Sequence, residues 1–131
     1  MKYFLSFSLF LLVVSIFFLS CAKHKGDIEE DIPAASVNFL SPAQNAVYKG
    51  DSVTIQAVGI STEPIHGYDI TIKKQNDTSV YFFKYVHEHN DTVYISEKWK
   101  SELHTNLEAS ITLYLDHEGH TSTKKVGFHV Q

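Results

Sequence analysis

Apolar and polar residues alternate along most of the chain after Ser36, which is the pattern of strands with one buried face. The clearest run extends from Leu107 to Leu115, where every second residue is apolar. Shorter runs of the same period begin at Val37, Val53, Tyr68, Val93 and Val126, and turn-forming residues such as Asp116-His117-Glu118-Gly119 separate them. About seven short antiparallel strands with such spacing predict an all-β sandwich over residues 36–131.

One run does not show which side it buries. Large aromatic side chains at alternate strand positions are usually buried, so we expect the aromatic side of residues 80–89 to face the core or a covering loop. If exposed, it would suit a protein partner or a sugar ring. That side carries Tyr81, Phe83, Tyr85, His87 and His89, and the other carries Val80, Phe82, Lys84 and Val86.

No sustained helical period occurs after residue 20. The one weak helical candidate is the stretch from Glu97 to Leu103. Trp99, within it, is expected to plug one end of the core.

Residues 1–20 have the pattern of a secretory signal peptide. Lys2 precedes an apolar run from Phe4 to Leu19. A single transmembrane anchor is the alternative, because the run is nearly long enough to span a bilayer. Ser20 before the only cysteine, Cys21, resembles the bacterial lipobox, although Phe18 stands where leucine is usual. That resemblance implies lipidation of Cys21 and attachment to a membrane through the lipid.

Residues 21–35 are expected to form a flexible acidic tether that holds the domain off the membrane. The stretch is charged, ends near Pro33 and has too little apolar surface to order itself. Its cluster of Asp27, Glu29, Glu30 and Asp31 resembles the acidic export signal of Bacteroidota surface lipoproteins, which implies an outer-membrane, surface-exposed location. An ordinary solvated linker explains the cluster equally well.

Composition narrows the classes of partner. After residue 20 the chain has fifteen acidic residues and ten lysines, a net charge of −5, and the sequence contains no arginine. Without a basic patch, a nucleic-acid partner is excluded. The domain of about 95 residues holds no cysteine, so it must fold on its apolar core alone.

Two stretches resemble bacterial immunoglobulin-like domains. The opening is Ser41-Pro42 followed by Gly50-Asp51-Ser52-Val53-Thr54-Ile55. The close is Leu113-Tyr114-Leu115-Asp116, Gly119 and a last strand ending Val126-Gly127-Phe128-His129-Val130. With the leader, the whole chain resembles a small family of Bacteroidota lipoproteins. The resemblance implies an immunoglobulin-like β-sandwich, and it specifies fold and not function.

Histidines supply the strongest candidate chemistry. Members of that family often carry a His-x-His pair, and His87-Glu88-His89 occupies a similar place, while Lys73-Lys74-Gln75-Asn76 replaces the further histidines of the preceding hairpin. On a strand His87 and His89 would share one face, about 6–7 Å apart at Cβ. They could converge on Zn²⁺ or Cu²⁺, or be merely solvated at a strand end. Candidate third ligands are His66, His104, Asp91, His117 and His120.

Other motifs are weaker. Ser52 in Asp51-Ser52-Val53 and Thr92 in Asp91-Thr92-Val93 resemble O-glycan acceptors of exported Bacteroidota proteins, although both also fit plain polar turns. No activated nucleophile, Gly-x-Ser-x-Gly elbow or phosphate loop is present, so we predict no enzymatic activity. The sequence predicts a non-catalytic binding, adhesion or accessory module for a protein or glycan, or alternatively a metal-binding lipoprotein that assists outer-membrane uptake.

Overall fold

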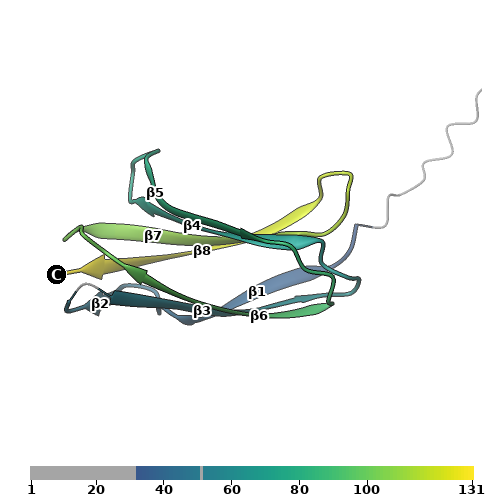
Figure 1. The fold of residues 1–131 in the computed structure, drawn as a ribbon, viewed down its shortest axis with the longest axis horizontal. Helices are drawn as coiled ribbons and strands as arrows, with labels where there is room; N and C mark the ends of the chain where they lie inside the picture. The colour runs from purple at the N-terminus through teal and green to yellow at the C-terminus, as the bar shows by residue number, and fades with distance from the viewer. Residues whose placement is uncertain (1–31, 51) are drawn as a thin grey trace, which may run out of the picture. The chain divides into compact units, whose positions relative to one another are not determined.

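The computed structural model describes residues 32–50 and 52–131 (Figure 1). The predicted signal peptide, Cys21 and most of the predicted tether lie outside the described residues. The unit Ile32–Gln131 is compact and has its own hydrophobic core. All regular elements of the described residues are strands, and none of these residues forms a helix long and apolar enough to cross a membrane.

Eight strands form two sheets. The three-stranded sheet has the order β1 (Ala35–Ser41), β3 (Ser52–Ser61), β6 (Thr92–Lys100). The five-stranded sheet has the order β2 (Ala46–Tyr48), β8 (Thr121–Val130), β7 (Asn106–Tyr114), β4 (Gly67–Lys74), β5 (Val80–Val86). Neighbouring strands pair antiparallel, except that β2 runs parallel to β8. The prediction of an all-β fold is confirmed, and the two sheets form a β-sandwich (Figure 1).

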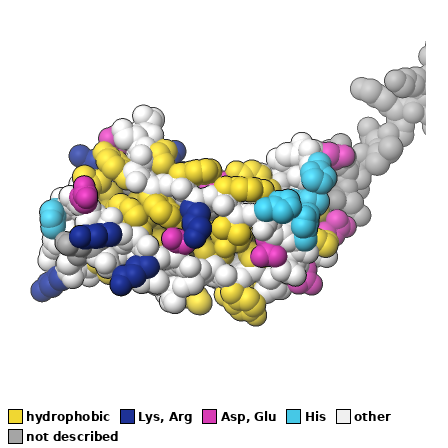
Figure 2. Space-filling view, viewed as in Figure 1, with side chains coloured by type: hydrophobic (Ala, Val, Ile, Leu, Met, Phe, Trp, Pro, Cys, Tyr) yellow, Lys and Arg dark blue, Asp and Glu magenta, His cyan; other side chains and the backbone are white. Residues whose placement is uncertain are grey.

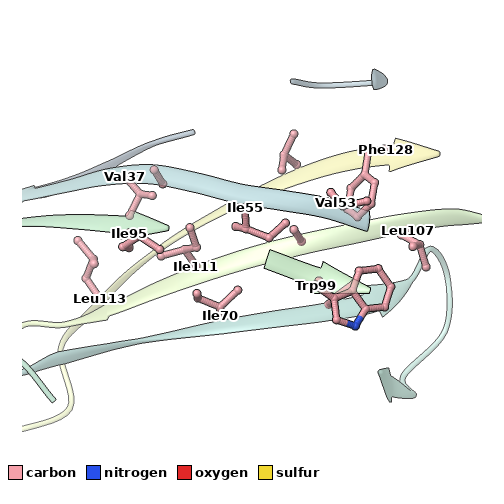
Figure 3. Packing of buried hydrophobic residues seen from close by; sticks show 14 of the residues in the cluster. Val37, Val53, Ile55, Ile70, Ile95, Trp99, Leu107, Ile111, Leu113 and Phe128 are labelled. Atoms are coloured by element: carbon pink, nitrogen blue, oxygen red, sulfur yellow. The ribbon is translucent and has the colours of Figure 1, made fainter. Parts of the chain in front are cut away.

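The inner faces of both sheets form one core. Ile111 and Leu113 of β7 are fully buried, as the alternation from Leu107 to Leu115 predicts. Side chains of β3, such as Ile55, lie over those of β4 and β7 (Figure 3). Apolar burial on this scale is the main favourable term in folding, and it holds this sandwich together without a disulfide among the described residues.

The helical candidate at Glu97–Leu103 is wrong. β6 continues as far as Lys100, with Glu97 opposite Ile55 and Trp99 opposite Val53. Pairing with β3 fixes this backbone as extended, because a strand's conformation depends on its cross-strand neighbours more than on local propensity. Trp99 is buried in the core, as expected.

The expected burial of the aromatic side of β5 is also wrong. Tyr81, Phe83 and Tyr85 are 42%, 60% and 49% exposed. β5 is an edge strand, and Phe83 and Tyr85 pair with Thr71 and Asp69 on the outer face of the five-stranded sheet. Hydrophobic side chains are visible on the surface in Figure 2. No described element covers this face of β5, so its aromatic rings stay in contact with solvent.

Candidate metal site at the histidine end

Three loops meet at one end of the sandwich, because β3, β5 and β7 all run toward that end. They are residues 62–66 between β3 and β4, residues 87–91 between β5 and β6, and residues 115–120 between β7 and β8. Backbone hydrogen bonds join them: the Ile65 N–H donates to the Asn90 carbonyl (2.9 Å), and the His66 N–H donates to the Tyr114 carbonyl (2.8 Å). Main-chain contacts therefore fix where the side chains of these loops lie.

Each loop contributes to a group of imidazole rings, which we call the histidine cluster: His66, His87, His89 and His117. The ring centroids of His66 and His117 are 4.3 Å apart. Those of His66 and His89 are 5.4 Å apart, and those of His87 and His89 are 4.5 Å apart. All three pairs meet edge to face, and Figure 2 shows histidines gathered at one end of the molecule.

His66 is the central member of the cluster and the least exposed. Its Nδ1 atom is buried and has no hydrogen-bond partner in the structure. A buried polar nitrogen without a partner is costly, and such atoms in folded proteins call for an explanation such as an absent ion or water. His66 therefore has a nitrogen available for a ligand.

The local backbone explains how His66 reaches this position. Ile65, next to it, is fully buried and anchors the loop in the core. Gly67, on the other side, has a φ of +151°, and a Cβ there would lie 2.5 Å from the Tyr85 hydroxyl and 2.8 Å from the Val86 carbonyl. Only glycine permits this close approach of the backbone after His66 to the end of β5.

The spacing of the rings fits a shared metal ion. Two imidazoles bound to one tetrahedral Zn²⁺ at about 2.0–2.1 Å place their ring centroids roughly 5 Å apart. The observed spacings of 4.3, 4.5 and 5.4 Å bracket that value. His87, His89 and His117 are exposed, so they can turn about their side-chain bonds to direct nitrogens toward an ion beside His66.

The turn that carries His117 also holds a second group of potential ligands. Ligand atoms of Asp116, Glu118 and His120 all lie within 4.8 Å of one another. Asp116 Oδ1 accepts hydrogen bonds from the backbone N–H groups of Glu118, Gly119 and His120, and Asp116 Oδ2 lies 2.5 Å from His120 Nδ1. This confirms the predicted hairpin turn at Asp116–Gly119, with Gly119 at a φ of +100°.

Hydrogen bonds strongly favour the ionised form of the Asp116 carboxyl group. Desolvation acts to raise its pKa, but hydrogen bonds from the backbone and side chain of His120 and from the backbone of Glu118 outweigh it and lower the pKa to about 2. A carboxylate therefore sits beside the histidine cluster at neutral pH, which favours a bound cation.

Of the five candidate third ligands, the structure brings His66 to His89 and brings His117 to His66. His104 lies between β6 and β7, at the other end of β7 from the cluster. His87 and His89 follow β5 and do not lie within it, so the prediction that they share one face of a strand is wrong. Their rings are nevertheless in contact. The sequence includes His66 and His117 among the candidate third ligands, but only the pairing of the strands shows that their loops lie next to the loop of His87 and His89.

The predicted glycan acceptors lie apart from each other on the three-stranded sheet. Ser52 is exposed at the start of β3. Thr92 is half-buried at the start of β6, opposite Ile60. Both remain predictions, as does lipidation of Cys21, which lies outside the described residues.

Comparison with known proteins bears on the fold alone. No family model and no curated protein matches the chain. Among solved structures, the chain is similar to an engineered protein, a Northeast Structural Genomics Consortium target, with a TM-score of 0.57 and 11% identity over 75% of this chain. The chain spans only 20% of that protein's length. At such low identity the likeness supports the β-rich architecture and says nothing of function.

Proposed function

We propose that this protein binds a transition-metal ion, Zn²⁺ or Cu²⁺, through the histidine cluster at the end of its sandwich. The observation that carries the proposal is the convergence of His66, His89 and His117 from three separate loops, with His87 beside them. The sequence by itself places only His87 and His89 together, and two histidines alone make a weak metal site. The rings of His89 and His117 both lie next to His66, whose Nδ1 is buried and unpartnered, and three or four imidazoles turned toward one ion would supply the ligands of a tetrahedral site.

The chemistry of the donors narrows the ion. Imidazole nitrogen suits Zn²⁺, Cu²⁺ and Ni²⁺, whereas Ca²⁺ and Mg²⁺ require mostly oxygen ligands. The cluster contains no thiolate, so it does not favour Cu⁺ through sulfur. Asp116 and Glu118, in the same turn as His117, supply negative charge nearby that compensates a divalent cation.

Isothermal titration of residues 32–131 with Zn²⁺ and Cu²⁺ tests the proposal. We expect a dissociation constant in the micromolar range or below. Affinity should fall as the pH is lowered from 7.5 to 5.5, since protons compete with the metal for imidazole nitrogen. His66→Gln should weaken binding by at least about tenfold, because it removes the central ligand.

His104→Gln is the matched control, because it removes an exposed histidine at the other end of β7. It should leave the affinity unchanged. Millimolar affinity, or equal binding by the His66 and His104 variants, would overturn the proposal. Loss of binding in Glu118→Gln with no loss in His66→Gln would place the ion in the turn and not in the cluster.

The setting of this site is part of the same proposal. We infer that Cys21 is lipidated and that the domain stands on the outer membrane at the end of its tether, supported by the leader pattern and the lone cysteine. We further infer an immunoglobulin-like sandwich, supported by the two sheets and by the edge strand β2, which runs parallel to β8. In this position the metal site would assist metal uptake across the envelope.

A non-catalytic binding or adhesion module is the second candidate function. The exposed aromatic side of β5 favours it, because large exposed apolar side chains in a row are typical of interaction surfaces. If the titrations detect no metal, this candidate is the one that remains.

A further inference from the structure

We propose that two copies of this protein pair through β5, edge to edge and antiparallel, about a two-fold axis at Phe83. Among the described strands, β5 bonds to β4 on one side only, so its other side presents unpaired backbone groups. Such an edge is a template for pairing with another strand. The strand therefore offers free backbone hydrogen-bonding groups at its edge. It also carries three exposed aromatic side chains, Tyr81, Phe83 and Tyr85, which we call the aromatic row.

The sequence of β5 is what selects a second copy as the partner. It reads Val80-Tyr81-Phe82-Phe83-Lys84-Tyr85-Val86, which is nearly the same in both directions about Phe83. An antiparallel two-fold places each residue opposite its mirror position, and a two-fold interface must be self-complementary. The pairs are Phe83 with Phe83, Tyr81 with Tyr85 and Val80 with Val86, in each case across the two copies.

The aromatic row lies where such pairing needs it. Tyr81, Phe83 and Tyr85 are all exposed, and Phe83 and Tyr85 lie on the outer face of the sheet. Aromatic cross-strand pairs contribute up to about 1 kcal/mol each. β5 has a bulge at Tyr81, between the residues that pair with Ile72 and Lys73, but the register with β4 is regular from Phe82 to Val86, which includes Phe83 at the axis and the residue on each side of it.

The one charged residue of β5 does not prevent this pairing. Lysine on an edge strand usually blocks association. Here the Lys84 ammonium is paired with the Glu97 carboxylate of β6, at 2.5 Å, on the side of β5 that faces the other sheet. The charge is therefore neutralised, and its aliphatic stem lies opposite Phe82 of the second copy.

The other described edge strands lack these features. Tyr94 of β6 is 80% exposed but stands without neighbouring exposed aromatics on its strand, and β2 has only three residues. β1 carries a single aromatic residue, Phe39, which is half-buried against the core. On β5, three half-exposed rings per copy, at about 150–250 Å² each, would bury roughly 600 Å² in total before backbone and flanking groups are counted. The interface is then near 1,000 Å², the lower limit of specific association, so weak and reversible pairing is expected.

Residues 32–131 allow a direct test of the register. This fragment contains both sheets and the whole described core, and it has no cysteine, because Cys21 is the only one. Residues opposite each other in antiparallel strands have Cα atoms about 4.5–5.5 Å apart, within disulfide range. In 1 mM EDTA with mild oxidant, Phe83→Cys should form covalent dimers.

Tyr94→Cys, a more exposed site on β6, is the control and should remain monomeric under the same conditions. By sedimentation in EDTA, Phe83→Lys should weaken association by at least tenfold, because two like charges would meet at the axis. Equal crosslinking of the Phe83 and Tyr94 cysteine variants, or a fragment that is monomeric at 500 µM, would overturn the proposal. So would a dimer that needs Zn²⁺ and is lost in His66→Gln, since the contact would then be the metal site. Loss of metal binding alone leaves the prediction for β5 unaffected.

Discussion

At the scale of single residues, the outer face of the five-stranded sheet contains a buried acidic side chain, Asp69, that accepts hydrogen bonds from two hydroxyl groups. Asp69 is only 6% exposed and accepts hydrogen bonds from the Tyr114 hydroxyl (2.7 Å) and the Thr71 hydroxyl (3.2 Å). The bond to Asp69, with burial, raises the pKa of Tyr114 to about 12. Tyr114 also packs against Tyr85, whose hydroxyl donates to the His66 carbonyl at 3.4 Å. The aromatic side of β5 and the histidine end are therefore connected.

Tyr114→Phe should destabilise the domain by about 1–3 kcal/mol, because the buried Asp69 carboxylate loses its closest donor. Urea denaturation at pH 7 measures this. Since the folded pKa of Tyr114 lies above its unfolded value of 10, the stabilisation is full below pH 10 and is lost as the pH rises toward 12. The variant should show no such loss. Tyr94→Phe, at an exposed site, should change stability by less than about 0.5 kcal/mol, and an equal effect of the two variants would contradict the role of Asp69.

At the scale of elements, the hairpin between β4 and β5 depends on a side-chain turn. The Asp77 carboxylate accepts hydrogen bonds from the backbone N–H and the hydroxyl of Ser79, both at 3.0 Å, and Asn76 adopts a φ of +61°. These bonds from Ser79, the backbone one foremost, lower the pKa of Asp77. The turn sets where β5 starts, and so it positions the aromatic row.

Asp77→Asn should lower the melting temperature at pH 7 by about 2–4 °C, because a neutral amide accepts more weakly than a carboxylate. The folded pKa of Asp77 is lowered, so its contribution is present above the ordinary value of 3.8 and is lost as the pH falls below it. Thermal melts followed by circular dichroism should therefore converge for variant and wild type near pH 2. Exposed Glu102→Gln serves as the control, and a constant difference at every pH would contradict the prediction.

The elements also show how far sequence could predict this structure. β7 was predicted because its alternation is unbroken and both of its neighbours bury the same face. The prediction for β5 buries the wrong side of the strand, because its position at the edge depends on the whole sheet and leaves no pattern in the local sequence. β2 was missed because its partner, β8, lies at the far end of the chain. β6 was cut short at Glu97, although Trp99 continues its alternation with Val93 and Ile95.

The candidate site follows the same rule. The sequence identified His87 and His89 from spacing, which is local information. His66 and His117 join them because strand pairing brings three loops to one end, where buried Ile65 and the bond from the His66 N–H to the Tyr114 carbonyl hold His66 in place. A local pattern could supply the ligand types, but the long-range register decided which of five candidates meet.

At the scale of the whole molecule, the two sheets share one core, so they should unfold together. Trp99, the only tryptophan, belongs to the three-stranded sheet, whereas Ile111 is fully buried in the five-stranded sheet. Ile111→Ala should cost about 2–5 kcal/mol through lost burial and the cavity left behind. Because the core is shared, this substitution should lower the urea concentration at the unfolding midpoint by the same amount whether Trp99 fluorescence or far-ultraviolet circular dichroism is followed. Ser110→Ala, on the outer face of β7, should shift neither curve by much. Fluorescence that kept its wild-type midpoint while the dichroism moved would show that the sheets unfold separately.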